Sequence, residues 1–142
     1  MQEKIITLKT AQLAKEKEFN WSTPDYYGKY LGVANDYTSQ SGGYDTERIV
    51  TNNWNDGWGS YPTRSEDVEC SAPTQSLLQK WLREIHHIHI TIEMVSIVSE
   101  TYCYIIRGNF PLINSYKDLD YEDTYESALE DALEKALNLI YK

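Results

Sequence analysis

Three histidines close to a glutamate are the first residues in this chain whose types could do chemistry. Glu84, His86, His87 and His89 spell the pattern E-x-H-H-x-H. Histidine is a common metal ligand, and an extended strand would place His87 and His89 on the same side. However, the sequence has no H-E-x-x-H motif and no matching carboxylate or cysteine cluster. Histidines are also ordinary at the end of a helix, so we expect no metal site here.

The cysteines and serines form no recognisable catalytic arrangement. Cys70 and Cys103 have no C-x-x-C neighbour, and in a chain that starts without an export signal we expect free thiols. Cys103 alternates with tyrosines in an apolar run, which is typical of a small buried side chain. The G-x-S-x-G, Walker, G-x-G-x-x-G and protein-kinase motifs are all missing, and no carboxylate pair stands out among 22 acidic residues. We therefore expect no catalytic residues and no cofactor.

A loop rich in aromatic and amide side chains contains the candidate binding residues Trp54, Asn55, Asp56, Trp58 and Tyr61. Exposed tryptophan and tyrosine beside asparagine and aspartate suit stacking on sugars or anchoring a partner protein. The alternative is that the rings fold inward, since the first half of the chain has few aliphatic side chains from which to build a core. Because tryptophan is highly buried on average, we favour the core role and keep the binding surface as the alternative.

The C-terminal half has the clearest secondary-structure pattern. A helix is expected over 73–86, with Pro73 in its first turn and an apolar face formed by Leu77, Leu78, Trp81, Leu82 and Ile85. The hydrophobic period then changes to two, which predicts a hairpin of strands at 88–98 and 101–107. An irregular third strand over 110–116 would carry Pro111 at a sheet edge.

A second amphipathic helix is expected over 124–140. Its start resembles a capping box from Asp123 to Glu126, and acidic residues there favour the positive end of the helix dipole. The N-terminal half has weaker patterns: a helix over 8–17 capped by Thr7, a strand over 26–34, and a short strand over 46–51.

The expected fold is α+β, in one domain over 1–142. Residues 35–71 are irregular and loop-rich, whereas 72–142 form a well-patterned helix–hairpin–helix core. A small antiparallel sheet of two to four strands packs against two amphipathic helices. The expected core residues are Leu78, Trp81, Leu82, Ile90, Ile92, Leu129, Leu133 and Leu137.

The acidic composition limits the partners. Lys and Arg number 13 against 22 Asp and Glu, a formal net charge of −9. A surface of this sign repels nucleic-acid phosphates and anionic lipids, so we expect no nucleic-acid and no membrane partner. The helix–strands–helix order also occurs in double-stranded-RNA-binding domains, but there the last helix begins with lysines rather than acids. With no apolar membrane span or leader pattern, the expected location is the cytoplasm.

Three segments together resemble a known family. They are S-A-P-T-Q-S-L-L-Q-K-W-L-R-E over 71–84, the helical string over 123–140, and T-L-K-T-A-Q-L-A over 7–14. The chain is similar to a family of short uncharacterised proteins from gut anaerobic bacteria, often found in prophages and phage genomes. The resemblance implies a mobile-element origin and carries over no activity, cofactor or site residue.

These observations predict a phage or prophage accessory protein that is not an enzyme and acts through contact with another protein. The identity of the partner is not predicted, and formation of a homo-oligomer is left open. Two alternatives remain: an acidic mimic of nucleic acid that inhibits a host protein, and a hydrolase with an unrecognised site.

Overall fold

The computed structural model describes residues 3–28, 32–35, 53, 55, 68–118 and 120–141. The strand expected over 46–51 lies outside the described residues, and so do most of the aromatic-loop candidates. No helix in the described part of the chain is both long and apolar enough to cross a membrane.

The chain forms two compact units, and each is described on its own. The C-terminal unit contains residues 1–4 and 74–142, and the N-terminal unit contains residues 5–73. The boundary at 73/74 lies close to residue 72, where the sequence pattern becomes regular. A single domain over 1–142 stays a prediction.

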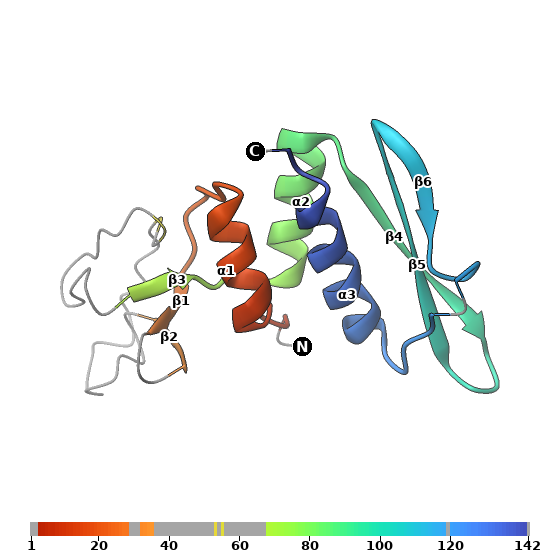
Figure 1. Cartoon of the computed structure of the whole chain (residues 1–142). Helices are drawn as coiled ribbons and strands as arrows, with labels where there is room; N and C mark the ends of the chain where they lie inside the picture. Colours follow the sequence, from red (N-terminus) through yellow and green to blue (C-terminus); the bar gives the residue numbers. More distant parts are fainter. Residues whose placement is uncertain are drawn as a thin grey trace. The chain divides into compact units, whose positions relative to one another are not determined.

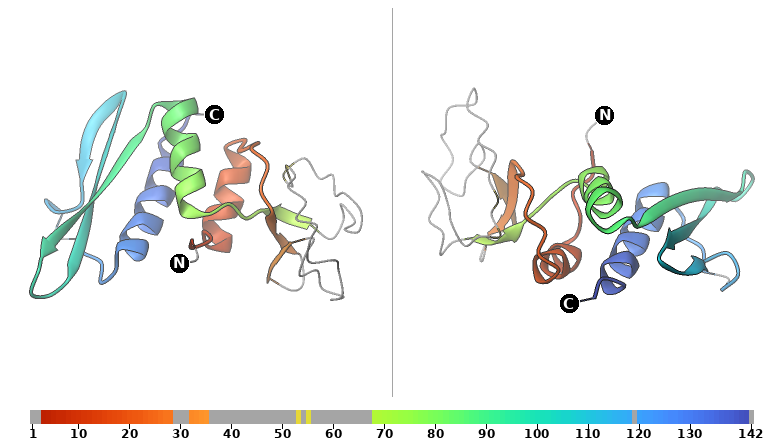
Figure 2. Two further views of the ribbon diagram at one scale, coloured as in Figure 1. Left: turned by 180° about the vertical axis from the view of Figure 1, so that it is seen from behind. Right: turned by 90° about the horizontal axis from the view of Figure 1, so that it is seen from above.

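The C-terminal unit has the expected α+β architecture. Its elements are α2 (Gln75–His86), β4 (His89–Ser96), β5 (Thr101–Gly108), β6 (Phe110–Asn114) and α3 (Tyr125–Asn138). The strands form an antiparallel sheet in the order β4–β5–β6. Helices α2 and α3 lie side by side and cover one face of this sheet (Figures 1 and 2). The predicted helix–strands–helix order and the small antiparallel sheet are confirmed.

Threonine side chains set where both helices of this unit begin. The hydroxyl oxygens of Thr74 and Thr124 each accept a hydrogen bond from the amide three residues later, at 3.2 and 3.0 Å. The sequence prediction placed Pro73 inside the first turn of α2 and Asp123 at the start of a capping box. Both positions are too early, because a threonine with extended backbone caps each helix and the helical residues follow it.

The predicted core is correct with one exception at the sheet. All but one of its members are buried: Leu78, Trp81, Leu82, Ile90, Leu129, Leu133 and Leu137. The exception is Ile92, which is only half-buried. On α2, Ile85 belongs to the predicted apolar face but is exposed, because the buried stripe of this helix passes through Leu78, Trp81 and Leu82 instead.

The N-terminal unit contains a helix and a second antiparallel sheet. Its elements are α1 (Leu8–Glu16), β1 (Asp25–Gly28), β2 (Gly32–Asn35) and β3 (Val68–Ser71), with strand order β2–β1–β3. The Thr7 cap of α1 is confirmed. The prediction of one strand over 26–34 is wrong: β1 and β2 pair antiparallel, from Asp25 opposite Asn35 to Gly28 opposite Gly32.

Strand β3 was not expected, because it falls at the end of the region predicted to be irregular. It pairs with β1 through Tyr26 opposite Ser71 and Tyr27 opposite Cys70. The core of this unit combines aromatic and small side chains: Ile6, Ala11, Ala14, Phe19, Tyr26, Cys70 and Ala72. Aromatic rings therefore do supply core volume in the half that is poor in aliphatic residues.

Candidate functional site

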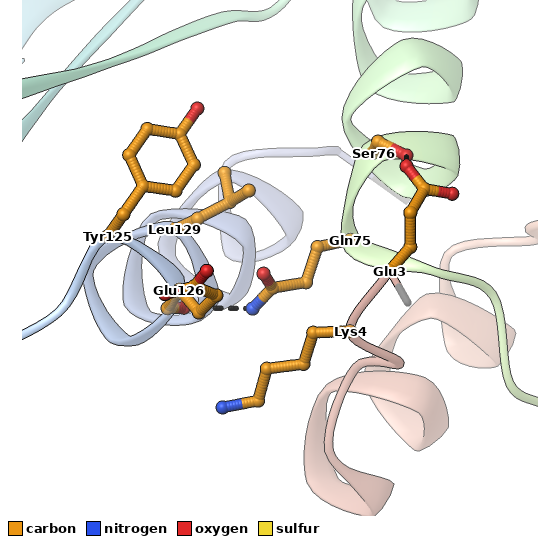
Figure 3. Close-up of a pocket in the computed structure, with 7 residues that line it drawn as sticks. All are labelled: Glu3, Lys4, Gln75, Ser76, Tyr125, Glu126 and Leu129. Carbon is orange, nitrogen blue, oxygen red and sulfur yellow. Dashed lines mark hydrogen bonds between the residues drawn. The ribbon is translucent and has the colours of Figure 1, made fainter. Parts of the chain in front are cut away.

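A pocket between the first turns of α2 and α3 is one candidate site. Its volume is about 250 Å³, and its lining residues are Glu3, Lys4, Gln75, Ser76, Tyr125, Glu126 and Leu129. Figure 3 shows the contributions of the N-terminal segment, α2 and α3 to its walls. All of these residues belong to the C-terminal unit.

Hydrogen bonds already hold the walls of this pocket. The buried Gln75 amide nitrogen donates to the Glu126 carbonyl at 2.8 Å and to a Glu130 carboxylate oxygen at 3.0 Å. The Ser76 hydroxyl donates to the Glu3 carboxylate. The lining contains no histidine or cysteine that could serve as a base or thiol nucleophile. The acidic side chains of the lining are Glu3 and Glu126, and the Ser76 hydroxyl already binds the Glu3 carboxylate.

The cysteines lie in environments that keep their thiols protonated. Cys103 lines a second cavity of about 230 Å³, and burial followed by the charge of Glu93 raises its pKa. The pKa of Cys70 is raised to about 12, mainly by burial and then by Glu69, against the opposing charge of Lys15. Because the thiolate is the reactive form, neither cysteine is activated as a nucleophile.

The histidines of the E-x-H-H-x-H pattern do not converge. The His86 ring makes an edge contact with Trp81, with ring centroids 4.6 Å apart, and burial followed by the neighbouring His87 lowers its pKa. His87 ends α2 in a left-handed conformation, with φ of 56°, and His89 begins β4. They therefore do not share one strand. In the described ranges, the side-chain cluster close enough to hold a metal ion contains only carboxylates.

Asn55 is the one aromatic-loop candidate inside the described residues. Its amide nitrogen donates to the Phe19 carbonyl and its amide oxygen accepts from the Ser71 amide, both at 2.8 Å. This side chain thus ties the segment after α1 to β3. The other four candidates, Trp54, Asp56, Trp58 and Tyr61, lie outside the described residues, so their binding role stays a prediction.

Among the described residues, one edge of the C-terminal sheet carries backbone groups without partners; we call it the β4 edge and define it by Ile92 and Met94. Backbone N–H and C=O groups point to alternate sides along an antiparallel strand. The Ile90 carbonyl accepts a hydrogen bond from the Gln79 side chain at 3.0 Å, so it points away from β5. The backbone groups of Ile92 and Met94, two and four residues later, point to the same outer side.

The central strand gives independent evidence for this orientation. Tyr104 and Tyr102 stand opposite the two residues of the β4 edge. The Tyr104 amide donates to the Ser115 hydroxyl at 2.8 Å, and the Tyr104 carbonyl accepts from the Ser115 amide at 3.0 Å. Tyr102 exchanges two bonds of 2.8 Å with the Glu122 backbone. Both tyrosines therefore direct their backbone groups away from β4. In the part of the chain that is described, the β4 edge is open for strand pairing.

Exposed apolar side chains lie next to this edge; we call Met94, Ile97 and Val98 the apolar tip. Their exposed fractions are 48%, 83% and 96%. Ile97 and Val98 occupy the turn between β4 and β5, where polar residues are usual. The sequence prediction placed both residues in the strand over 88–98, but β4 ends at Ser96 and they lie in the turn that follows.

Comparisons with protein-family models, with curated proteins and with solved structures found no match.

Proposed function

We propose that this chain acts by binding another protein, as an accessory protein of phage or prophage origin, and that the β4 edge with the apolar tip is the binding surface. The observation that carries the proposal is the row of backbone groups at Ile92 and Met94, with which no strand of the described residues pairs on the outer side. An open edge of this kind accepts an extended segment of another chain, which adds one strand to the sheet. The origin rests on the sequence resemblance.

The chemistry of the edge indicates what the incoming segment is like. Its backbone would pair with the β4 edge, and its apolar side chains would cover Met94 on the face that α2 and α3 occupy. On the opposite face the exposed Glu93 favours a basic or polar side chain. The net charge of −9 would also speed association with a basic partner. We therefore propose an extended, amphipathic and basic segment of a partner protein.

Hydrogen exchange of the complex tests this proposal at single amides. In the free chain the amides of Ile92 and Met94 should exchange quickly, while those of Thr91 and Glu93, which face β5, should exchange slowly. A partner is first captured from host lysate and identified by mass spectrometry. Its binding should slow the exchange of Ile92 and Met94 and leave Thr91 and Glu93 unchanged. A bound partner that leaves the first two amides fast would contradict the proposal.

A proline substitution at Met94 distinguishes the role of the backbone N–H in binding from the role of the Met94 side chain. Met94→Pro removes an outward-pointing N–H without breaking the β4–β5 ladder, and it should abolish capture of the partner. Met94→Ala keeps the N–H and loses only the side chain, so it should bind more weakly but still bind. Circular dichroism must show both variants folded. Equal capture by wild type and Met94→Pro would show that strand addition is not the binding mode.

A second copy of the chain is the competing occupant, and sedimentation can detect it. A dimer that dissociates in Met94→Pro but persists in Met94→Ala would assign the edge to self-pairing and overturn the proposal of a foreign partner.

Because of the net charge, we also expect no gel shift with duplex DNA or RNA at physiological salt.

A further inference from the structure

The cavity that contains Cys103 opens on the face of the C-terminal sheet opposite to α2 and α3. We call it the Glu93 pocket; its volume is about 230 Å³, and its lining residues are Glu93, Met94, Val95, Cys103, Asn114 and Tyr116. Glu93 stands directly opposite Cys103 in the sheet, so these two side chains share a face. The alternate residue Tyr102 faces the helices, because its ring contacts Tyr125 of α3. The Glu93 pocket therefore extends from the edge strand β4 across β5 to the end of β6.

The fold holds the floor and the aromatic wall of the Glu93 pocket in place. Cys103, on the central strand, is 4% exposed and forms the floor. Burial followed by the charge of Glu93 raises its pKa, so the floor is an uncharged thiol at neutral pH. The Asn114 side-chain oxygen accepts a hydrogen bond from the Tyr116 amide at 2.9 Å. The Tyr116 ring packs on the Tyr121 ring, with centroids 5.8 Å apart, and Tyr116 remains 51% exposed.

The charge of the lining favours a cationic ligand. Glu93 is its charged member, and within the described ranges no ion pair involves this carboxylate. A guanidinium group suits both Glu93 and Tyr116, because its planar fork matches a carboxylate and its face stacks on an aromatic ring. An ammonium group would satisfy the charge but would lack the planar stacking surface. The lining therefore favours arginine over lysine.

Strand addition at the β4 edge would bring a side chain to this pocket. On an added strand, the residue directly opposite Glu93 lies on the same face, with its Cβ atom about 4.5–5.5 Å away. Neighbouring strands lie about 4.8 Å apart, and the methylene groups of an arginine can cross this spacing along the apolar surface of Val95. Because side chains alternate between the two faces, the pocket would select one position of the incoming segment.

We propose that the Glu93 pocket binds an arginine side chain of the partner segment. The Glu93 carboxylate accepts hydrogen bonds from the guanidinium group, and the Tyr116 ring stacks on its plane. This inference rests on the proposed strand addition for the delivery of the arginine. It narrows the proposed basic segment to one that carries an arginine opposite Glu93.

The pocket can be tested in the full chain without the partner. The probe is Nα-acetyl-L-arginine N-methylamide, titrated at constant ionic strength and followed by NMR of the backbone amides. We expect saturable shifts at the amides of Glu93, Cys103 and Tyr116. The corresponding citrulline compound has nearly the same shape but no charge, so it should bind about fivefold more weakly or less.

Two pairs of variants assign the binding to the carboxylate and to the ring. Glu93→Gln should weaken binding of the arginine probe about fivefold, because it removes the charge and keeps the shape. The matched control Glu100→Gln removes the same charge from an exposed residue outside the lining and should change the affinity by less than about twofold. Tyr116→Phe keeps the ring and should bind like wild type, whereas Tyr116→Leu should bind more weakly. Circular dichroism must show all four variants folded.

Equal affinity for the arginine and citrulline probes would overturn the proposal, and so would equal affinity in wild type and Glu93→Gln. Hydrogen exchange in the partner complex separates this inference from the proposed function. Slowed amides of Ile92 and Met94, with equal capture by wild type and Glu93→Gln, would keep strand addition and overturn the arginine site. Arginine-probe binding that Glu93→Gln weakens, with those two amides still fast in the complex, would support the arginine site and contradict strand addition.

Discussion

Replacing Gln75 would test whether its amide joins α2 to α3. The side chain is 4% exposed and donates both of its bonds from one nitrogen. One bond goes to the Glu126 carbonyl (Figure 3) and the other to the Glu130 carboxylate. Gln75→Met keeps the length and the burial but removes the donor. A hydrogen bond to a charged group contributes about 1.5–3 kcal/mol and one to a carbonyl about 0.5–1.5 kcal/mol.

The sum of these two hydrogen-bond energies is an upper limit on the destabilisation by Gln75→Met, for two structural reasons. Glu130 is half-exposed, so water can replace the lost donor at its carboxylate. The Glu126 carbonyl lies within α3 and can still accept the bond of its own helix. We therefore expect Gln75→Met to lower the free energy of unfolding by about 1–3 kcal/mol.

Urea denaturation followed by circular dichroism measures this loss, and hydrogen exchange in α2 and α3 assigns it to the C-terminal unit. The matched control is Gln12→Met on the exposed face of α1, which should stay within about 0.5 kcal/mol of wild type. Gln75→Glu should destabilise more than Gln75→Met at pH 7, since it places a second carboxylate beside Glu130. Part of that loss should return in acid, where the new side chain is protonated and can donate. If Gln75→Met is as stable as the control, the amide bonds make no net contribution and apolar packing alone holds the two helices.

Three further predictions follow from burial and charge. Leu133→Ala, at a fully buried position, should cost about 2–5 kcal/mol in urea denaturation, whereas Ile97→Ala at the exposed turn should cost almost nothing. At least one of Trp54→Ala and Trp58→Ala should cost about 3–5 kcal/mol in a thermal melt, and two melts like the wild type would instead make the aromatic loop a ligand site. Burial and then the charges of Asp120, Glu122 and Glu134 raise the pKa of Asp131 above its ordinary 3.8, so the folded chain holds that proton more tightly than the unfolded chain. The contribution of Asp131 should therefore make the free energy of unfolding fall as pH rises through and above 3.8, and Asp131→Asn should remove that fall; a variant with the wild-type pH profile would contradict this.

The C-terminal unit was predictable because each element has its own hydrophobic period. The buried stripe of α2 recurs at helical spacing through Leu78, Trp81 and Leu82, and the pattern changes to a period of two at Ile88. These local signals agree with the final packing, so element order and most of the core could be inferred without tertiary information. The errors at the helix starts are small, because several adjacent residues at each start could serve as the cap.

The N-terminal sheet was harder to predict because its strands are short and its pairing is long-range. The sequence pattern predicts one strand over 26–34, whereas Gly28 ends β1 and Gly32 begins β2. Strand β3 joins β1 only after more than thirty intervening residues, and its apolar–polar alternation covers only the four residues Val68–Ser71. A four-residue strand of this kind becomes recognisable only through its partner.

The proposed binding edge could not be found from the sequence. The β4 edge depends on which backbone groups face outward, and that is decided by hydrogen bonds of Gln79, Ser115 and Glu122 rather than by residue type.

The same alternation that opens the β4 edge also holds the loop before α3. Tyr102 and Tyr104 turn their backbone groups away from β4, and on that other side Tyr102 pairs with Glu122 in the loop between β6 and α3. One central strand thus leaves the outer side of β4 open for a partner while it holds the loop that leads into α3.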